Sequence, residues 1–244
     1  MKTKIKIYFV IISSLFLSAC MPPNINLNSE INNKNRPQKN VSNADKKYQE
    51  LVKFVKEKEG DISVDDVNAI RDYYVETSFY QPYISIPSLL VQATFSLIKD
   101  KKWKACIKNS KLILNYQYMN INGHYLAMLC NEKLGNKEQK IKHQKMISTI
   151  IDAIWSTGDG KTKQSAFYTY STPELQAFLQ LQGLQIIGQS LVTDKTKYYD
   201  LMQVKDPKSK KEFSLYFNIT KQWQKGFNKT RIVTPNIKHH EQTQ

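Results

Sequence analysis

The sequence lacks an apolar run long enough to cross a membrane. Its longest one, residues 7–19, holds about a dozen residues, whereas a membrane-spanning helix needs about 20. Lys2, Lys4 and Lys6 precede this run, and a polar stretch follows it at once. A basic start followed by a short apolar run is typical of an export signal, so we expect residues 1–19 to be a signal peptide.

The end of this signal, LSAC at residues 17–20, resembles the bacterial lipobox: an aliphatic residue, two small residues and a cysteine. In that family of signals the cysteine is acylated on its thiol and, after cleavage, on its new amine. The alternative is an ordinary secretory cleavage site that happens to precede a cysteine. We expect Cys20 to carry more than one acyl chain and to anchor the protein to a membrane. By the proteobacterial sorting rule, Asp directly after the cysteine favours the inner membrane. Met21 stands there instead, so we expect the outer membrane, facing the periplasm.

Acidic residues are scarce, with 21 Asp and Glu against 36 Lys and Arg and a formal net charge of +15. Loss of the three signal lysines lowers this charge to about +12. A chain this basic favours an anionic partner. We expect a lipid surface or an acidic envelope polymer, and no nucleic acid, because no recognition motif for nucleic acid is present and the predicted compartment is extracytoplasmic.

A complete phosphate-binding loop is missing, although STGDGKT at residues 156–162 ends like one. The motif would require a glycine where Trp155 stands, with a strand before it and a helix after it. The predicted order here is the reverse, so we expect no nucleotide and no cofactor. We interpret the segment as a joint, in which Gly158 ends a helix in a left-handed turn and Asp159 and Gly160 form a tight turn.

Four stretches of different character follow the signal peptide. Residues 20–44 are rich in Asn, Pro, Ser and Lys and predict a lipid-anchored disordered tether. Residues 45–155 have a helical pattern, residues 156–225 mix strand and helix patterns, and residues 226–244 predict a basic flexible tail. The predicted fold class is therefore α+β, with helical hairpins packed as one unit on a small, mostly antiparallel sheet with one helix.

The helical part begins with two helical segments, the second of which Ser63 is expected to cap. Four more helices are predicted at about 87–99, 102–115, 121–134 and 137–155. Aligning Asp100 with Asn136 gives an offset of 36 residues, near the period of tetratricopeptide repeats. We therefore expect two tetratricopeptide-like hairpins over about 70 residues.

Cys106 and Cys130 remain for pairing once Cys20 is lipidated. They lie at equal distances from the turn of one predicted hairpin, so a disulfide is feasible if both face the partner helix. The alternative is two small buried thiols that pack as apolar residues. With His124 and His143 they would offer zinc ligands, but the spacings fit no short-range zinc motif, and we expect no metal site.

The C-terminal part predicts strands in alternating, often aromatic segments at 165–171, 184–192, 197–204 and 212–220. Residues 172–183 predict its one helix. Ser171 or Thr172 would cap this helix, Pro173 stands in its first turn, and Gly183 ends it.

Several of these segments, taken in order, resemble a bacterial lipoprotein family described as domain of unknown function 4919. They are HYLAMLCNEKLGN at 124–136, His143, STGDGKTKQSAFYTYST at 156–172, YYDLMQV at 198–204 and LYFNIT at 215–220. The likeness covers about residues 75–220, with the GDGK joint and the YFN strand as its more specific features. It implies relatedness to extracytoplasmic proteins and brings no catalytic residues with it.

No catalytic motif is complete. A hydrolase would pair His143 with Asp159 and a serine such as Ser156, but no G-x-S-x-G elbow is present, and the C-terminal half shows no paired carboxylates. We therefore predict no catalytic residues and expect the central histidines to bond between helices or to the joint. The candidate residues for a joint or pocket between the two halves are His124, His143, Gly158, Asp159 and Gly160.

The 14 tyrosines gather in clusters, which indicates either core packing or a binding surface. Taken together, these patterns predict a non-catalytic scaffold that uses its helical surface to hold an envelope protein partner. The alternative is an envelope glycan-binding module, or a hydrolase that acts on a cell-wall polymer.

Overall fold

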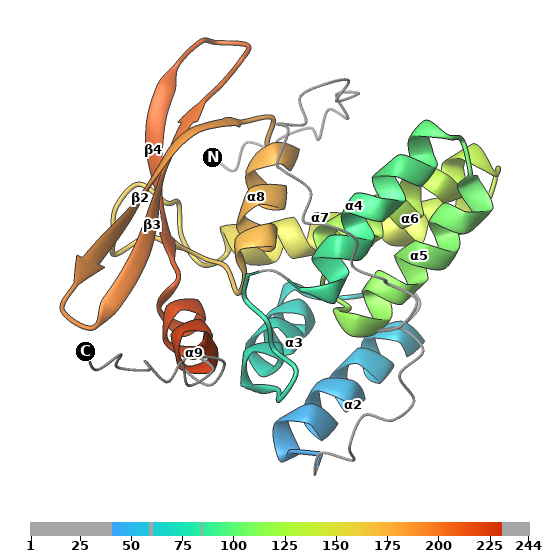
Figure 1. The fold of residues 1–244 in the computed structure, drawn as a ribbon, viewed down its shortest axis with the longest axis horizontal. Helices are drawn as coiled ribbons and strands as arrows, with labels where there is room; N and C mark the ends of the chain where they lie inside the picture. The colour runs from blue at the N-terminus through green and yellow to red at the C-terminus, as the bar shows by residue number, and fades with distance from the viewer. Residues whose placement is uncertain (1–40, 59–60, 84, 231–244) are drawn as a thin grey trace, which may run out of the picture.

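The computed structural model describes residues 41–58, 61–83 and 85–230, which form an α+β fold (Figure 1). The helices are α2 (Asn43–Glu57), α3 (Val64–Glu76), α4 (Ile86–Lys99), α5 (Trp103–Tyr116), α6 (Ile121–Lys133), α7 (Lys137–Trp155), α8 (Thr172–Leu181) and α9 (Thr220–Thr230). The strands are β1 (Phe167–Tyr168), β2 (Gln185–Asp194), β3 (Lys197–Lys205) and β4 (Glu212–Asn218). The predicted fold class is confirmed.

Several predicted features lie outside the described residues: the signal peptide, Cys20 and the end of the basic tail. Over the part of the chain that the structure covers, no helix combines the length and the apolar character that a membrane crossing requires.

Serine caps begin the first two helices. Ser42 accepts the backbone N–H of Asp45 at 3.0 Å, and the Asp45 carboxylate accepts that of Ser42 at 3.0 Å. Ser63 and Asp66 form the same reciprocal arrangement at α3, which confirms the predicted cap. Each capping box satisfies N–H groups that have no partner inside the helix. Helix α2 begins at Asn43, slightly earlier than the predicted end of the tether.

Helices α4 to α7 pack side by side in chain order as successive hairpins (Figure 1). Their bounds lie within one residue of those predicted. A disulfide joins Cys106 of α5 to Cys130 of α6, with their Cα atoms 6.3 Å apart. Leu90, Ile113 and Leu126 surround it in a small apolar cluster that links α4, α5 and α6.

The sheet has the strand order β1-β4-β3-β2. Strand β1 runs parallel to β4, and the other neighbours are antiparallel. β1 is shorter than predicted because the chain turns into α8 directly after it: the Tyr170 N–H donates to the Glu174 carboxylate at 2.9 Å, and Ser171 caps the helix. Gly183, in the left-handed conformation at φ +75°, follows the end of α8 as predicted.

The C-terminal part holds a second helix, α9, where we predicted a longer last strand followed by a flexible tail. Strand β4 stops at Asn218, whose side-chain oxygen accepts the N–H of Thr220 at 3.0 Å. Trp223 of α9 stacks on Tyr198 of β3, with ring centroids 5.3 Å apart. The helix is otherwise rich in Lys and Gln, so its apolar periodicity was too sparse to indicate a helix.

One apolar core joins the helical part to the sheet. Ile150 and Ile154 of α7 meet Phe167, Phe178 and Phe217, and each of the five is at most 1 % exposed. The Phe167 ring lies 5.2 Å from that of Phe178 and 5.4 Å from that of Phe217, centroid to centroid. The two parts therefore pack as one unit.

Candidate functional site

The joint between the two halves is a tight turn, but its left-handed residue is Gly160 and not Gly158, contrary to our prediction. Gly160 has φ +71°, and its carbonyl accepts the N–H of Tyr216 in β4 at 2.7 Å. Gly158 is required for another reason, since a Cβ there would lie 2.1 Å from the carbonyl oxygen of Ser165. Asp159 accepts a hydrogen bond from Ser165 Oγ at 2.6 Å, which lowers the pKa of Asp159. The contacts of Asp159 and Gly158 with Ser165 stay within the loop, and the hydrogen bond from Tyr216 to Gly160 joins the loop to the sheet.

The two central histidines contact each other far from this joint. Their Nδ1 atoms are 2.9 Å apart, and Nε2 of His124 lies 2.7 Å from the carbonyl oxygen of Tyr118. Burial lowers the pKa of His124 to about 3 and that of His143 to about 4, so both are neutral at pH 7. A helix rises about 1.5 Å per residue, which places Ser156 roughly 20 Å farther along α7. The arrangement of His143 with Asp159 and Ser156 that a hydrolase would need is therefore not formed.

The cysteines and histidines do not form the zinc site that we considered. Both thiols are taken up in the disulfide. Within the described ranges, no group of three or more His, Cys, Asp or Glu side chains is placed to hold a metal ion.

The tyrosine clusters serve mainly as core. Tyr74 and Tyr80 are 4 % and 1 % exposed, and their rings meet edge to face at 5.3 Å. Tyr73 and Tyr83 are each 40 % exposed. Tyr83 is thus available at the surface, and it borders a site that lies elsewhere.

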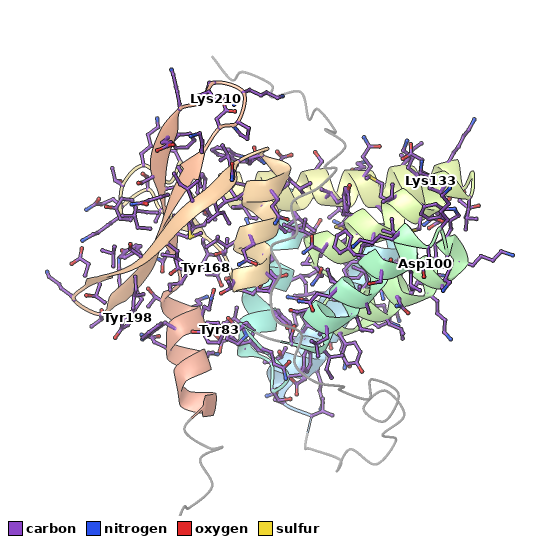
Figure 2. All side chains as sticks on the ribbon, turned by 45° about the horizontal axis from the view of Figure 1, so that its top comes forward. Tyr83, Asp100, Lys133, Tyr168, Tyr198 and Lys210 are labelled. Carbon is purple, nitrogen blue, oxygen red and sulfur yellow. A yellow bond between two sulfur atoms is a disulfide. The ribbon has the colours of Figure 1, made fainter. Side chains whose placement is uncertain are left out.

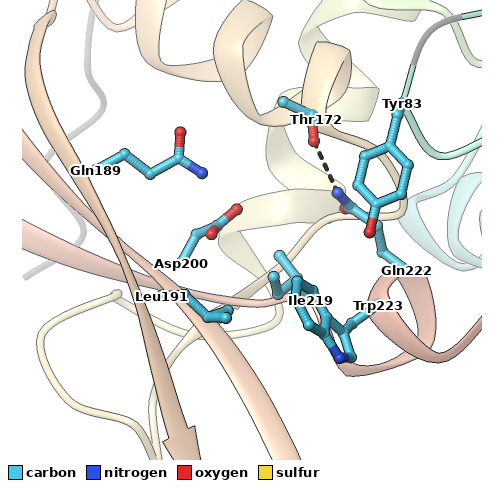
Figure 3. Close-up of a pocket in the computed structure, with 8 residues that line it drawn as sticks. All are labelled: Tyr83, Thr172, Gln189, Leu191, Asp200, Ile219, Gln222 and Trp223. Atoms are coloured by element: carbon cyan, nitrogen blue, oxygen red, sulfur yellow. Dashed lines mark hydrogen bonds between the residues drawn. The ribbon is translucent and has the colours of Figure 1, made fainter. Parts of the chain in front are cut away.

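A pocket of about 330 Å³, which the sequence analysis did not predict, lies between the sheet, the start of α8 and helix α9 (Figure 3). Its walls come from segments far apart in the sequence. The lining residues are Tyr83, Thr172, Gln189, Leu191, Asp200, Ile219, Gln222 and Trp223.

The alternation of strand β3 directs Asp200 into this pocket. Side chains of a strand point to opposite faces in turn, so Asp200 shares a face with Met202 and Val204, which enter the core. Across the sheet, Asp200 pairs with Leu191 and Met202 pairs with Gln189. An acidic residue at a position that alternation assigns to the apolar face was the one signal in the sequence that pointed here.

The Asp200 carboxylate is buried, and the part of the chain that the structure describes gives it no counterion. The residue is 4 % exposed, and burial raises its pKa, while a hydrogen bond with the Gln189 side chain opposes the shift. Tyr83 faces the same pocket, and its pKa is raised by burial and by the Asp200 charge. Among the described residues, no Lys or Arg forms an ion pair with Asp200.

Gln222 of α9 offers the pocket a second polar group. Its side chain is buried at 1 % exposure, and Nε2 donates to the Thr172 hydroxyl at 2.7 Å (Figure 3). The other end of the amide, Oε1, has no hydrogen-bond partner within the described part of the chain. Buried polar atoms in proteins are nearly always paired, so this atom is suited to a ligand.

Two aromatic rings border the pocket. Trp223 is fixed by its stacking on Tyr198, with an interplanar angle of 21°. Tyr83 packs on α9 at Gly226, where a Cβ would lie only 2.4 Å from the Tyr83 ring. Both rings are held by their neighbours, so the aromatic sides of the pocket are formed before any ligand enters.

The fold and this pocket define an α+β protein whose sheet and helix α9 border a pocket of the size of a small ligand. The chain matches the domain of unknown function 4919 over residues 35–227 and therefore belongs to that family. The matched span includes every residue that lines the pocket. No curated protein and no solved structure matches the chain.

Proposed function

We propose that this protein is a lipid-anchored component of the bacterial cell envelope that binds a sugar unit of an envelope glycan in the Asp200 pocket. The observation that carries the proposal is that Asp200, Gln189 and Gln222 line one pocket together with the rings of Tyr83 and Trp223, and that Gln222 Oε1 has no partner among the described residues. A sugar ring presents hydroxyl groups at its rim and C–H groups on its faces. Amide and carboxylate oxygens accept from the hydroxyls, and aromatic rings pack on the faces.

The size of the pocket supports a small ligand. At about 330 Å³ it lies at the lower end of the range for small-molecule sites. Its mixture of aromatic, amide and carboxylate groups is that of a site with a few polar groups to fix orientation. One sugar unit at the end of a longer polymer matches both properties.

The pocket favours binding over hydrolysis. Glycosidases use two carboxyl groups on either side of the bond that they cleave. Asp200 is the one carboxylate that lines the pocket within the described ranges. We therefore propose recognition of the glycan without cleavage, and no cofactor.

The proposed location rests on the N-terminal signal. Lys2, Lys4 and Lys6, the apolar run after them and Cys20 match a lipoprotein signal. Two or more acyl chains give stable anchoring where one is marginal. We propose the outer membrane, facing the periplasm, because Met21 follows the cysteine.

Anchoring is tested by replacing the lipidated residue. In cells fed a palmitate analogue, the native chain should be labelled and recovered with membranes, and the Cys20→Ala variant should be unlabelled. Equal labelling of both forms would contradict the proposed anchor.

Glycan binding is tested with two matched tyrosine variants. The full chain, purified in detergent, is titrated with soluble envelope-glycan fragments. Tyr83→Ala should weaken binding roughly tenfold, since it removes one aromatic side of the pocket. Tyr73→Ala is the control, because Tyr73 is equally exposed at 40 % but does not line the pocket. Equal losses in both variants, or no binding by the native chain, would refute the proposal.

A second candidate function, the scaffold that holds an envelope protein partner, is favoured by the edge strand β2. This strand ends the sheet order, and Ile187 and Leu191 on it are 45 % and 46 % exposed. An edge strand can accept a strand from a partner. In-cell crosslinking, with Ile187→Lys as the variant, should capture one reproducible protein that the variant loses.

A further inference from the structure

We infer that the ligand of the Asp200 pocket carries a protonated amine, which binds between the Asp200 carboxylate and the rings of Tyr83 and Trp223. This inference rests on the proposed binding function of the pocket and specifies its ligand further. An amino sugar with a free amine is the kind of ligand that satisfies both the proposed binding of a sugar unit and the inferred binding of a protonated amine.

The first argument is the uncompensated charge. Asp200 is 4 % exposed and, among the described residues, is the one charged residue that lines the pocket. Burial of a carboxylate without a paired cation is costly. The chain has an excess of Lys and Arg that gives it a net charge of +15, yet within the described residues no Lys or Arg lines the pocket. A ligand ammonium would supply the missing counter-charge.

The second argument is the kind of hydrogen bond that remains open. Gln222 Oε1, which is buried and has no partner in the described residues, is an acceptor. The Asp200 carboxylate is also an acceptor when ionised. An ammonium group has three N–H donors and no acceptor, so it suits a pocket lined by these two acceptors better than a hydroxyl, which has one donor.

The third argument is the pair of aromatic rings. The faces of Trp and Tyr rings attract cations, and this attraction grows when water is excluded. Tyr83 and Trp223 both line the pocket beside Asp200 (Figure 3). A carboxylate with two aromatic rings favours an ammonium over a neutral group of the same size.

The test compares three sugars that differ at one position, together with a simple amine that has no sugar hydroxyls. The full chain, purified in detergent and labelled with ¹⁵N-tryptophan, is titrated with the methyl glycosides of glucosamine, N-acetylglucosamine and glucose, and with cyclohexylamine. The indole N–H signal of Trp223, assigned with Trp223→Phe, reports binding. Glucosamine should bind on the order of tenfold more tightly than the two neutral sugars, as expected for a charge pair shielded from water.

Asp200→Asn should abolish this preference, so that glucosamine binds no more tightly than the two neutral sugars. Asp100→Asn is the matched control, because it makes the same change of charge at the exposed tip of the helical hairpins, far from Tyr83 (Figure 2). Thermal unfolding checks that both variants fold. If Asp200→Asn does not fold, the comparison of the probes on the native chain still shows whether the pocket prefers a protonated amine.

The outcomes separate the inference from the proposed function. Equal binding of all three sugars would overturn the inference and leave glycan binding intact. Binding of cyclohexylamine without any sugar, lost in Asp200→Asn, would support the inference and refute the glycan. Binding of no probe would overturn both.

Discussion

Arg71 of α3 and Glu174 of α8 form a buried bidentate ion pair between residues 103 positions apart in the sequence. Nε and Nη2 of Arg71 lie 2.9 and 3.1 Å from the two carboxylate oxygens. The side chains are 0 % and 2 % exposed. Nη2 also donates to the carbonyl oxygen of Tyr168 at 2.8 Å. The pair fixes the helical part against the start of the sheet.

Glu174→Gln should destabilise the protein by about 3–5 kcal/mol, because it leaves the buried Arg71 guanidinium without its counter-charge. Urea unfolding followed by circular dichroism measures the change. Glu132→Gln is the control, since it removes an exposed ion pair with Lys140 and should cost less than about 1 kcal/mol. Similar losses from the two substitutions would show that the buried pair has no special role.

Stability should fall as the pH drops from about 6.5 towards 4. His124 and His143 have folded-state pKa values of about 3 and about 4, below the ordinary value of 6.5, because burial disfavours their charged forms and Lys56 and Lys111 add to the effect. In that window the unfolded chain binds protons that the folded chain does not, so acid favours unfolding. The two neutral histidines contribute fully to the stability of the fold above their unfolded-state pKa. This stabilisation is lost as the pH falls from there through their folded-state pKa values.

The measurement is urea unfolding at several pH values between 7.5 and 4.5, on the native chain and on His124→Gln/His143→Gln. The double variant should show a flatter dependence in this range. Parallel curves would mean that the histidines are not the groups responsible.

Removal of the disulfide should cost roughly 3 kcal/mol, since Cys106 and Cys130 close a loop with a separation of 24 residues in the unfolded chain. Cys106→Ala/Cys130→Ala tests this by thermal unfolding under oxidising conditions. The same comparison in a reductant is the control, where the difference should shrink. Mass spectrometry of peptides prepared without reductant must show the crosslinked pair, and two free thiols there would contradict the structure.

Gly160→Ala should destabilise more than Gly135→Ala, although both glycines have positive φ, at +71° and +76°. The strain of that conformation costs about 1–2 kcal/mol in either case. A Cβ on Gly160 would also lie 2.5 Å from the Phe167 ring, whereas nothing lies within 4 Å of one on Gly135. The extra overpacking should add about 1–3 kcal/mol. Equal unfolding midpoints for the two variants would argue against a tight joint.

The local elements were largely predictable because their signals are local. Caps such as Ser63, short polar turns and apolar periodicity gave the bounds of α4 to α7 to within a residue. The same approach failed where local signals were weak or misleading. Helix α9 has few apolar residues, and Gly158 was taken for the left-handed residue because the nearby return of the chain at Ser165 is not visible in the sequence.

The sequence by itself determined the α+β class, the order of the elements from α2 to β4, the position of the joint and membership of the family, since each depends on residues close together in the chain or on a matched pattern. Only the tertiary structure decided which polar side chains meet. The pair of Arg71 and Glu174 and the pocket around Asp200 join segments about a hundred residues apart. Such contacts follow from the packing of whole elements around one core, and no local pattern encodes them.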